Sequence, residues 1–219
     1  ASDVYKRQGE RTRKVLVVIQ YTASMILLCG TLIVFAQLSF MRNQSLGVKT
    51  GQTLVVKFPG HTEGMNTKLE AMKKAISRLP LVHKVTFSGA VPGEEVATFL
   101  SNRRTNDALK QNRLYEMLAC DPDYVDAYGL TVVAGRGFSE EYGDDVDKLV
   151  INETAVRNLG FTSNDEAIGQ QVTVECTDAP MQIIGVVQDY HQQALSKNYT
   201  PIMSVSYTHL RAHETKANL

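Results

Sequence analysis

The apolar residues of this chain are concentrated in one uncharged run close to its beginning. Residues 15–41 contain no Asp, Glu, Lys or Arg, and Lys14 and Arg42 bracket the run. An α-helix rises about 1.5 Å per residue, so a helix over this run exceeds the roughly 30 Å hydrocarbon core of a bilayer. The pattern therefore predicts a transmembrane helix.

Three alternatives to a spanning helix can be weighed from the same run. A cleaved signal peptide has an apolar core of only about 7–15 residues, which is shorter than this run. A lipoprotein signal is disfavoured because Leu28 stands before Cys29, where a small residue is needed, and apolar residues continue beyond it. A buried helix of a soluble protein remains as the third alternative, and the absence of charge argues against it.

Basic residues set the expected orientation of this helix. Arg11, Arg13 and Lys14 immediately precede it. Positive residues beside a membrane span favour the cytoplasmic side, so the N-terminal flank is expected in the cytoplasm and everything after Arg42 outside it.

Polar residues inside the run suggest that the helix has neighbours. Gln20, Thr22, Ser24 and Thr31 interrupt the apolar sequence, and small or polar residues of spanning helices usually face other helices. Helix-compatible composition continues as far as Gly47, which predicts a short stalk beyond the membrane that ends at this glycine.

After Gly47 the periodicity changes to that of a mixed α/β domain. Strands are predicted at residues 53–58, 82–88, 113–120, 130–133, 148–152, 171–175 and 181–189, and helices at residues 62–79, 124–128 and 153–159. In the first of these helices Leu69, Met72, Ile76 and Leu79 form an apolar stripe, and its lysines, including Lys73, are expected in solvent. The polar stretch 95–112 is expected to be mobile or at an edge. The fold class is therefore α+β.

The two ends of the chain differ from the rest. Residues 1–8 and 205–219 look like translated sequencing adapter and are set aside from the fold. The expected organisation is a transmembrane helix and stalk over residues 9–47, followed by one core domain over residues 48–204.

Composition narrows the possible functions. The formal net charge is +0 and no basic face is visible, so nucleic acid is not an expected partner. Three cysteines are too few for a disulfide scaffold. Cys120 and Cys176 could pair in an oxidising compartment, although free buried thiols are the favoured alternative.

A phosphate-binding loop is the first candidate for chemistry, at Gly135 and Gly137. This pair lacks the third glycine and the Lys-Ser/Thr pair of a nucleotide site. A tight turn that needs a positive φ is the better interpretation, and it would let Arg136 point away from the turn while Phe138 packs. No cofactor is expected.

Metal or acid–base chemistry is the second candidate. His209, His213 and Glu214 have helical metal-ligand spacing but lie in the segment set aside above. The Asp189-Tyr190-His191 stretch is interpreted as a structural turn, because adjacent side chains on a strand point to opposite faces. Glu140, Glu141, Asp144, Asp145 and Asp147 lack the ligand order of a calcium loop and are interpreted as a solvated loop. No catalytic, cofactor-binding or metal-binding residue is assigned.

Several stretches of the chain occur in an order that resembles a known family. They are Gly135-Arg136-Gly137-Phe138-Ser139, the run 150–160 (VINETAVRNLG), Ala167-Ile168-Gly169-Gln170, the run 183–191 (IIGVVQDYH), and at the front the runs 13–20 (RKVLVVIQ) and 37–47 (QLSFMRNQSLG). Together they resemble MacB-type ABC-transporter permeases of the FtsX superfamily, with a MacB-like periplasmic core domain after a membrane helix. The front end resembles the large permeases common in Bacteroidota.

The resemblance implies a role and a set of partners. It implies a permease subunit of the bacterial inner membrane, with its C-terminal domain in the periplasm and without an ATPase site of its own. Its partners would be a cytoplasmic ABC ATPase subunit, a second permease copy or half, a periplasmic adaptor or client protein, and membrane lipid. The function would be efflux, lipoprotein release or mechanotransmission driven by the separate ATPase.

Two other functional classes remain open from the sequence. The extracytoplasmic sensor domain of a signalling receptor also follows a membrane helix, and a second helix leading to a cytoplasmic output module would identify it. A membrane-anchored periplasmic enzyme is the other, and no convergent set of nucleophile, base or metal ligands supports it.

Overall fold

The computed structural model describes residues 2–58, 65–106, 111–142, 145–175, 177 and 179–206, with the backbone alone for residues 2–11, 43, 65–67 and 140. The chain divides into two compact units, Ala1–Ser45 and Leu46–Leu219. Each unit is described by itself below.

The first unit is one long helix, α1 (Ser2–Asn43). Within it, residues Thr12–Arg42 are long and apolar enough to cross a membrane, and none of the span is buried by the protein. The Oγ1 atoms of Thr22 and Thr31 donate to the carbonyls of Val18 and Leu27, each at 2.8 Å. Because these hydroxyls are satisfied within the helix, the two threonines give less support for neighbouring helices than their polarity suggested.

The stalk is shorter than predicted. α1 ends at Asn43, and the last helical-type bond runs from the Gln44 amide to the Phe40 carbonyl. Gly47 has a φ of +77° but lies beyond this end. From Leu46 onward the backbone bonds within the second unit rather than continuing the helix. At its other end α1 begins at Ser2, so the helix crosses the division expected at residue 8.

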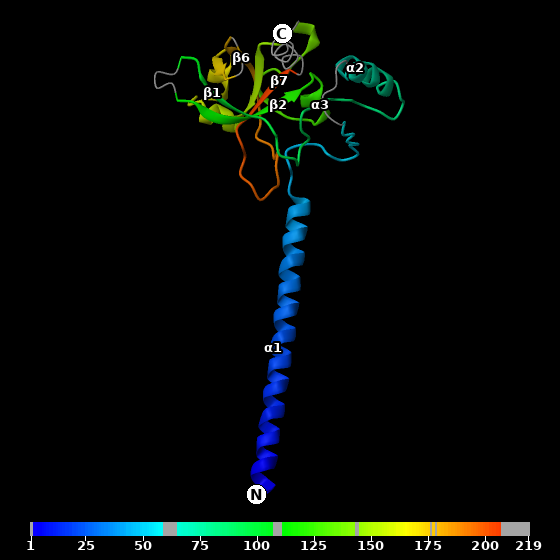
Figure 1. The fold of residues 1–219 in the computed structure, drawn as a ribbon, viewed down its shortest axis with the longest axis vertical. Coiled ribbons are helices and arrows are strands. Elements are labelled where there is room, and N and C mark those ends of the chain that lie inside the picture. Colours follow the sequence, from blue (N-terminus) through cyan, green and yellow to red (C-terminus); the bar gives the residue numbers. More distant parts are fainter. Residues whose placement is uncertain are drawn as a thin grey trace. The chain divides into compact units, whose positions relative to one another are not determined.

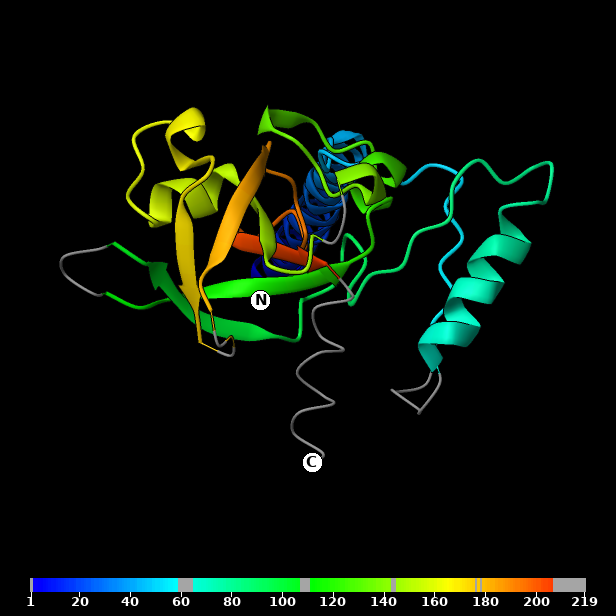
Figure 2. The same cartoon turned by 90° about the horizontal axis from the view of Figure 1, so that it is seen from above.

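The second unit is built on one seven-stranded sheet with the order β3-β6-β4-β7-β2-β1-β5. The strands are β1 (Phe99–Arg104), β2 (Arg113–Cys120), β3 (Val132–Gly135), β4 (Lys148–Asn152), β5 (Gln171–Val174), β6 (Met181–Val187) and β7 (Ile202–Ser206). An additional pairing of β5 with β6 closes the sheet into a ring, with β3 on the remaining half of the β6 edge (Figure 1; Figure 2). The pairs β2–β7 and β4–β6 are parallel, and the other pairs are antiparallel.

Two hydrophobic cores lie on the two faces of this sheet. Alternate residues of β2 separate into them: Tyr115, Met117 and Ala119 join one core, and Leu118 and Cys120 join the other. This is the period of two that a strand buried on both faces requires. The first core also contains residues of α4 and α5, and the second contains residues of α3.

The helices of this unit are short. They are α2 (Met65–Ile76), α3 (Tyr124–Ala127), α4 (Glu153–Asn158) and α5 (Asn164–Ala167), and a 3-10 turn, η1 (Glu140–Tyr142), accompanies them. Side chains cap two of them: Asn152 accepts from the Ala155 amide at α4, and Ser163 accepts from the Glu166 amide at α5. Gly160, with a φ of +81°, follows the C-terminal end of α4.

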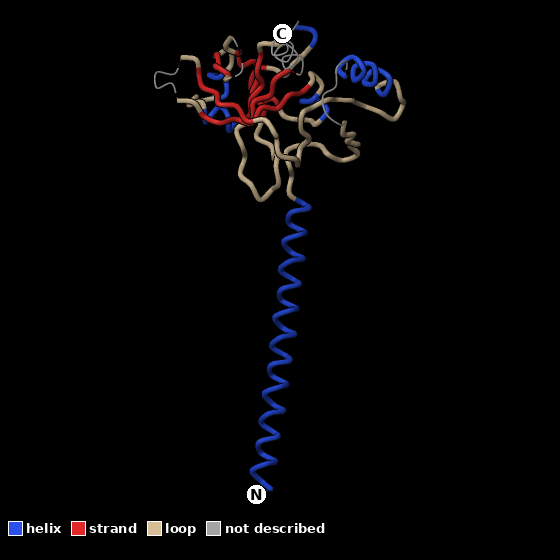
Figure 3. Tube along the Cα trace, in the orientation of Figure 1, coloured by secondary structure: helices blue, strands red, loops and turns tan. Residues whose placement is uncertain are grey.

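The α+β class is confirmed, and so are the strands at β2, β4, β5 and β6 and the helices at α3 and α4. Two predicted strands are wrong: residues 53–58 are loop, and in residues 82–88 only Ser88 makes a bridge, to Cys120 (Figure 3). The polar stretch 95–112, expected to be mobile or at an edge, contains β1, which lies between β2 and β5. Neither α5 nor β7 was predicted.

The last strand crosses the boundary expected at Ser204. Val205 pairs with Ala119 and Leu149, and Ser206 pairs with Cys120. Both residues are buried, Val205 in the first core. The adapter origin of residues 205–219 stays a prediction, but their first two members are part of the sheet.

Helix α2 lies beside the sheet, outside both cores (Figure 2). Of its apolar stripe Leu69 is buried and Leu79, just beyond the helix, is exposed. Lys73, expected in solvent, instead contacts Asp121 at 2.6 Å and Asp123 at 2.5 Å. These two ion pairs raise the pKa of Lys73 against the opposing effect of its burial, which is the largest single influence. Lysine-carboxylate pairs therefore attach α2 to the region of α3.

Candidate interaction site

The second unit begins with a linker segment, residues 46–49, which follows the end of α1. The Leu46 carbonyl accepts from the His191 amide at 2.9 Å, and the Lys49 amide donates to the Tyr128 carbonyl at 2.8 Å. Gly47 lies between them against Tyr190, where an added Cβ would be 3.1 Å from the tyrosine Cβ. The linker segment is thus fixed at both ends to separate parts of the domain.

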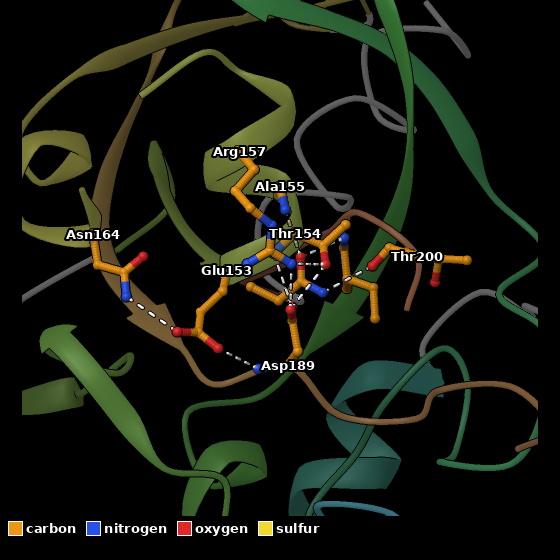
Figure 4. Close-up of polar contacts among 9 residues, drawn as sticks. Glu153, Thr154, Ala155, Arg157, Asn164, Asp189 and Thr200 are labelled. Atoms are coloured by element: carbon orange, nitrogen blue, oxygen red, sulfur yellow. Dashed lines mark hydrogen bonds and ion pairs between the residues drawn. The ribbon is translucent and has the colours of Figure 1, made fainter. Parts of the chain in front are cut away.

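Asp189 organises the chain just after β6. Its carboxylate accepts from the Thr154 amide at 2.8 Å, the Thr154 hydroxyl at 2.9 Å and Nη2 of Arg157 at 2.7 Å (Figure 4). The Asp189 amide donates to Glu153 Oε2 at 3.1 Å. The first turn of α4 and the residue after β6 are therefore held together by charge-assisted hydrogen bonds.

Asn152 makes a second junction at the start of α4. Its Oδ1 accepts from the amides of Ala155 at 3.0 Å and Ile202 at 2.9 Å, and its Nδ2 donates to the Thr200 carbonyl at 2.8 Å (Figure 4). One buried amide thereby joins the end of β4, the start of α4 and the start of β7.

Between Asp189 and β7 runs a loop, residues 190–201, with buried anchors. Gln192 Nε2 donates to the carbonyls of Val91 at 2.9 Å and Glu94 at 3.2 Å. Gln193 Nε2 donates to Oε1 of the buried Glu116 at 2.6 Å. Burial raises the pKa of Glu116, and its hydrogen bonds with Thr200 and Gln193 oppose that rise.

An open hollow lies where this loop meets α4. Its lining consists of Thr154, Arg157, His191 and residues 195–199, and its volume is about 480 Å³. The charged side chains of this lining, Arg157 and Lys197, are both basic, and they are 61% and 56% exposed. The His191 ring lies 4.4 Å from the Tyr199 ring.

The structural interpretation of Asp189, Tyr190 and His191 agrees with their contacts. Asp189 holds α4, Tyr190 is buried in the second core, and the His191 backbone binds the linker segment. Sequence reasoning missed the hollow that begins at His191, because its other walls come from α4 and from a loop without periodicity.

The predicted turn at Gly135 is present, with a φ of +68°. Phe138 is buried as expected. Arg136, expected to point away from the turn, instead donates Nη1 back to the Gly137 carbonyl at 2.9 Å. It also makes a bidentate pair with Asp145, at 2.8 and 2.9 Å, and its guanidinium lies 4.4 Å from the Tyr142 ring centre.

The acidic loop is consequently not wholly solvated. Asp145 is buried and also accepts from the Ser139 amide, and the hydrogen bond from Arg136 is the main cause that lowers its pKa. Asp147 is exposed as expected, whereas Asp144 lies outside the described residues.

The remaining sequence candidates add no chemical site. His209, His213 and Glu214 lie outside the described residues, as does Cys176, so the pairing of Cys176 stays untested. Cys120 is free and fully buried, and burial raises the pKa of its thiol. Among the residues that the structure describes, no group of three or more metal-ligating side chains occurs.

The chain is similar to one protein family and to several solved structures. The family model of the MacB-like periplasmic core domain matches residues 23–218. No curated protein matches the chain. Solved structures that resemble it include the periplasmic region of MacB from Actinobacillus actinomycetemcomitans, with 19% identity and a TM-score of 0.45 over 67% of this chain. Another is the extracellular domain of the ABC-type transporter YknZ from Gram-positive bacteria, with 18% identity and a TM-score of 0.47 over 67% of this chain.

The chain spans 58% of the first of these structures and 66% of the second, less than two thirds of either. The family model covers most of the chain, including the second half of α1 and the whole described sheet. The chain therefore belongs to the family of the MacB-like periplasmic core domain.

Proposed function

We propose that this chain is part of an ABC-transporter permease that passes movement from membrane helices to a periplasmic domain. A separate cytoplasmic ATPase drives the movement, and α1 carries it out of the membrane with its N-terminal end in the cytoplasm. Family membership supports the permease assignment, and the basic flank of α1 supports the orientation.

The observation that carries the coupling role is the attachment of the linker segment. Its backbone bonds to His191 and Tyr128 lie on opposite sides of Gly47, which itself packs against Tyr190. Each backbone hydrogen bond contributes about 1 kcal/mol of stability. Together the two bonds leave the linker segment less free to move than a linker without such bonds. A segment held in this way passes displacement to the sheet, whereas a flexible one absorbs it.

The test is to loosen the link without touching the domain. A Gly-Ser-Gly-Ser insertion between Gln44 and Ser45 is made in the intact permease, reconstituted with its ATPase. The distance between the two permease copies is followed by spin labels at Asn198→Cys, with Cys29 and Cys176 replaced by serine. Cys120 stays because it is buried.

We expect ATP to change the inter-label distance in the parent protein, and the insertion to abolish that change while ATP hydrolysis continues. The same insertion between Ala179 and Pro180, which are exposed and follow β5, is the matched control and leaves the change intact. An ATP-driven change that survives the first insertion would refute coupling through the linker segment.

A further inference from the structure

We propose that the hollow between α4 and the loop 190–201 docks the phosphate group of an anionic phospholipid, at the outer surface of the membrane that α1 spans. This interaction uses the membrane anchoring of the chain but not the coupling role. The two proposals can therefore fail separately.

Position is the first argument. His191, which lines the hollow, donates its backbone amide to Leu46 at 2.9 Å. Leu46 follows Asn43, the last residue of α1, by three positions. Three residues of chain reach at most about 11 Å. Through its bond to Leu46, the His191 side of the hollow is therefore held at the part of the domain where the chain enters from α1. Figure 1 shows the loop, in orange, projecting from the sheet at the end where the second unit begins.

Charge is the second argument. Arg157 and Lys197 line the hollow from different elements, and no carboxylate is among its described lining residues. Glu95, outside the lining, lies 3.5 Å from Lys197 in an exposed ion pair, which a phosphate group can replace. In the contacts that the structure describes, Asp189 binds Arg157 only through Nη2. More than half of the Arg157 side chain is exposed to solvent. A guanidinium that a carboxylate holds through one nitrogen, on a side chain that is mostly exposed, is well suited to phosphate.

The uncharged lining is the third argument. Tyr199 is 45% exposed beside His191, and Leu195 is half-buried in the same loop. Tyrosine with basic residues is the composition that proteins place at the interface between membrane and water. An acidic peptide would match the charge alone, so a lipid surface fits more of the lining.

The absence of tryptophan from the sequence provides the reporter. Tyr199→Trp makes a single-tryptophan form of the full chain, which is reconstituted without any ATPase in nanodiscs. The nanodiscs contain phosphatidylcholine with increasing fractions of phosphatidylglycerol, and either lipid carries brominated acyl chains that quench tryptophan on contact. Leu81→Trp, at a 91% exposed position beyond α2, is the control reporter.

We expect brominated phosphatidylglycerol to quench Trp emission of the Tyr199→Trp form more strongly than brominated phosphatidylcholine at equal content. Lys197→Gln should raise the phosphatidylglycerol fraction for half-maximal quenching about fivefold, the effect of one basic residue at an anionic surface. Lys74→Gln, the same charge change on exposed α2, should leave that fraction unchanged. Far-UV circular dichroism verifies that each variant is folded.

Three results would overturn the proposal. One is equal quenching by the two lipids, and another is the same effect from Lys74→Gln as from Lys197→Gln. The third is a loss of tryptophan quenching when inorganic phosphate or polyglutamate is added, if that loss is larger than sodium chloride causes at equal ionic strength. That last result would assign the hollow to a soluble anion or to an acidic peptide.

Discussion

Gly135 and Gly185 face each other where β3 meets β6, and their lack of side chains lets the two strands approach. A Cβ on Gly185 would lie 1.9 Å from the Arg136 carbonyl oxygen, and one on Gly135 would lie 2.2 Å from the Ile184 carbonyl oxygen. Both neighbours are backbone atoms, which cannot move aside as a side chain can. Close backbone approach is therefore the physical requirement at this pair.

We expect Gly185→Ala to destabilise the domain by about 3 kcal/mol, because the new methyl group must displace backbone. The melting temperature should fall by about 6–12 °C for a chain of this size. Gly137→Ala is the control, since its Cβ would meet Val125 at an ordinary 3.7 Å. Near-UV circular dichroism of the solubilised chain measures both, and equal melting temperatures would contradict the steric argument.

Glu116 is a buried acid whose pKa is raised above the ordinary value of 4.5, so its charge opposes folding. As the pH rises above 4.5, the unfolded chain ionises while the folded protein retains the proton, and stability falls until the pH passes the folded pKa. We expect Glu116→Gln to melt at a higher temperature than the parent protein at pH 8, because the amide carries no charge that folding has to bury.

The higher melting temperature of Glu116→Gln should disappear well below pH 4.5, because Glu116 is then protonated in both the folded and the unfolded parent protein. Glu141→Gln, an exposed acid on η1, serves as the comparison and should show no such pH dependence. A Glu116→Gln form less stable than the parent at pH 8 would mean that the Glu116 charge stabilises the fold.

At the scale of elements, β7 is the strand that joins the two parts of the sheet. It pairs in parallel with β2 and antiparallel with β4. Without it the ring of strands is open between β2 and β4. Its five residues are all buried, so both faces of the strand contribute to the cores.

Two truncations test this strand. A chain that ends after Ser206 keeps all of β7 and should melt as the full chain does. A chain that ends after Ser204 loses buried Val205 and two ladder positions, and we expect a loss of about 3 kcal/mol and a melting temperature about 6–12 °C lower. Equal stability of the two truncated chains would show that β7 effectively ends at Ser204.

For the whole molecule, orientation in the membrane is the property that decides where the second unit works. The basic residues before α1 favour the cytoplasm. A reporter that is active only in the periplasm should therefore be active when fused after Lys57. The same reporter fused after Lys14 should be inactive. The reverse pattern would place the domain in the cytoplasm and remove the basis of both proposals.

The sequence by itself determined the features that depend on local composition. An uncharged run produces a membrane-length helix because no charged side chain has to enter the bilayer. The strands predicted at residues 113–120 and 148–152 and the helix predicted at residues 153–159 lie close to the observed bounds of β2, β4 and α4. The structural interpretation of Asp189-Tyr190-His191 agrees with their contacts, but its stated reason is wrong, because β6 ends at Val187 and these residues are not on a strand.

Only the tertiary structure decided the features that depend on partners distant in the chain. Residues 53–58 have strand composition but, in the described part of the chain, no ladder partner, whereas the polar β1 is a strand because β2 and β5 lie on both sides of it. The pairing of Arg136 with Asp145 and the hollow beside His191 likewise join segments brought together by folding. A strand or a site needs a neighbour, and the sequence does not show which neighbour folding supplies.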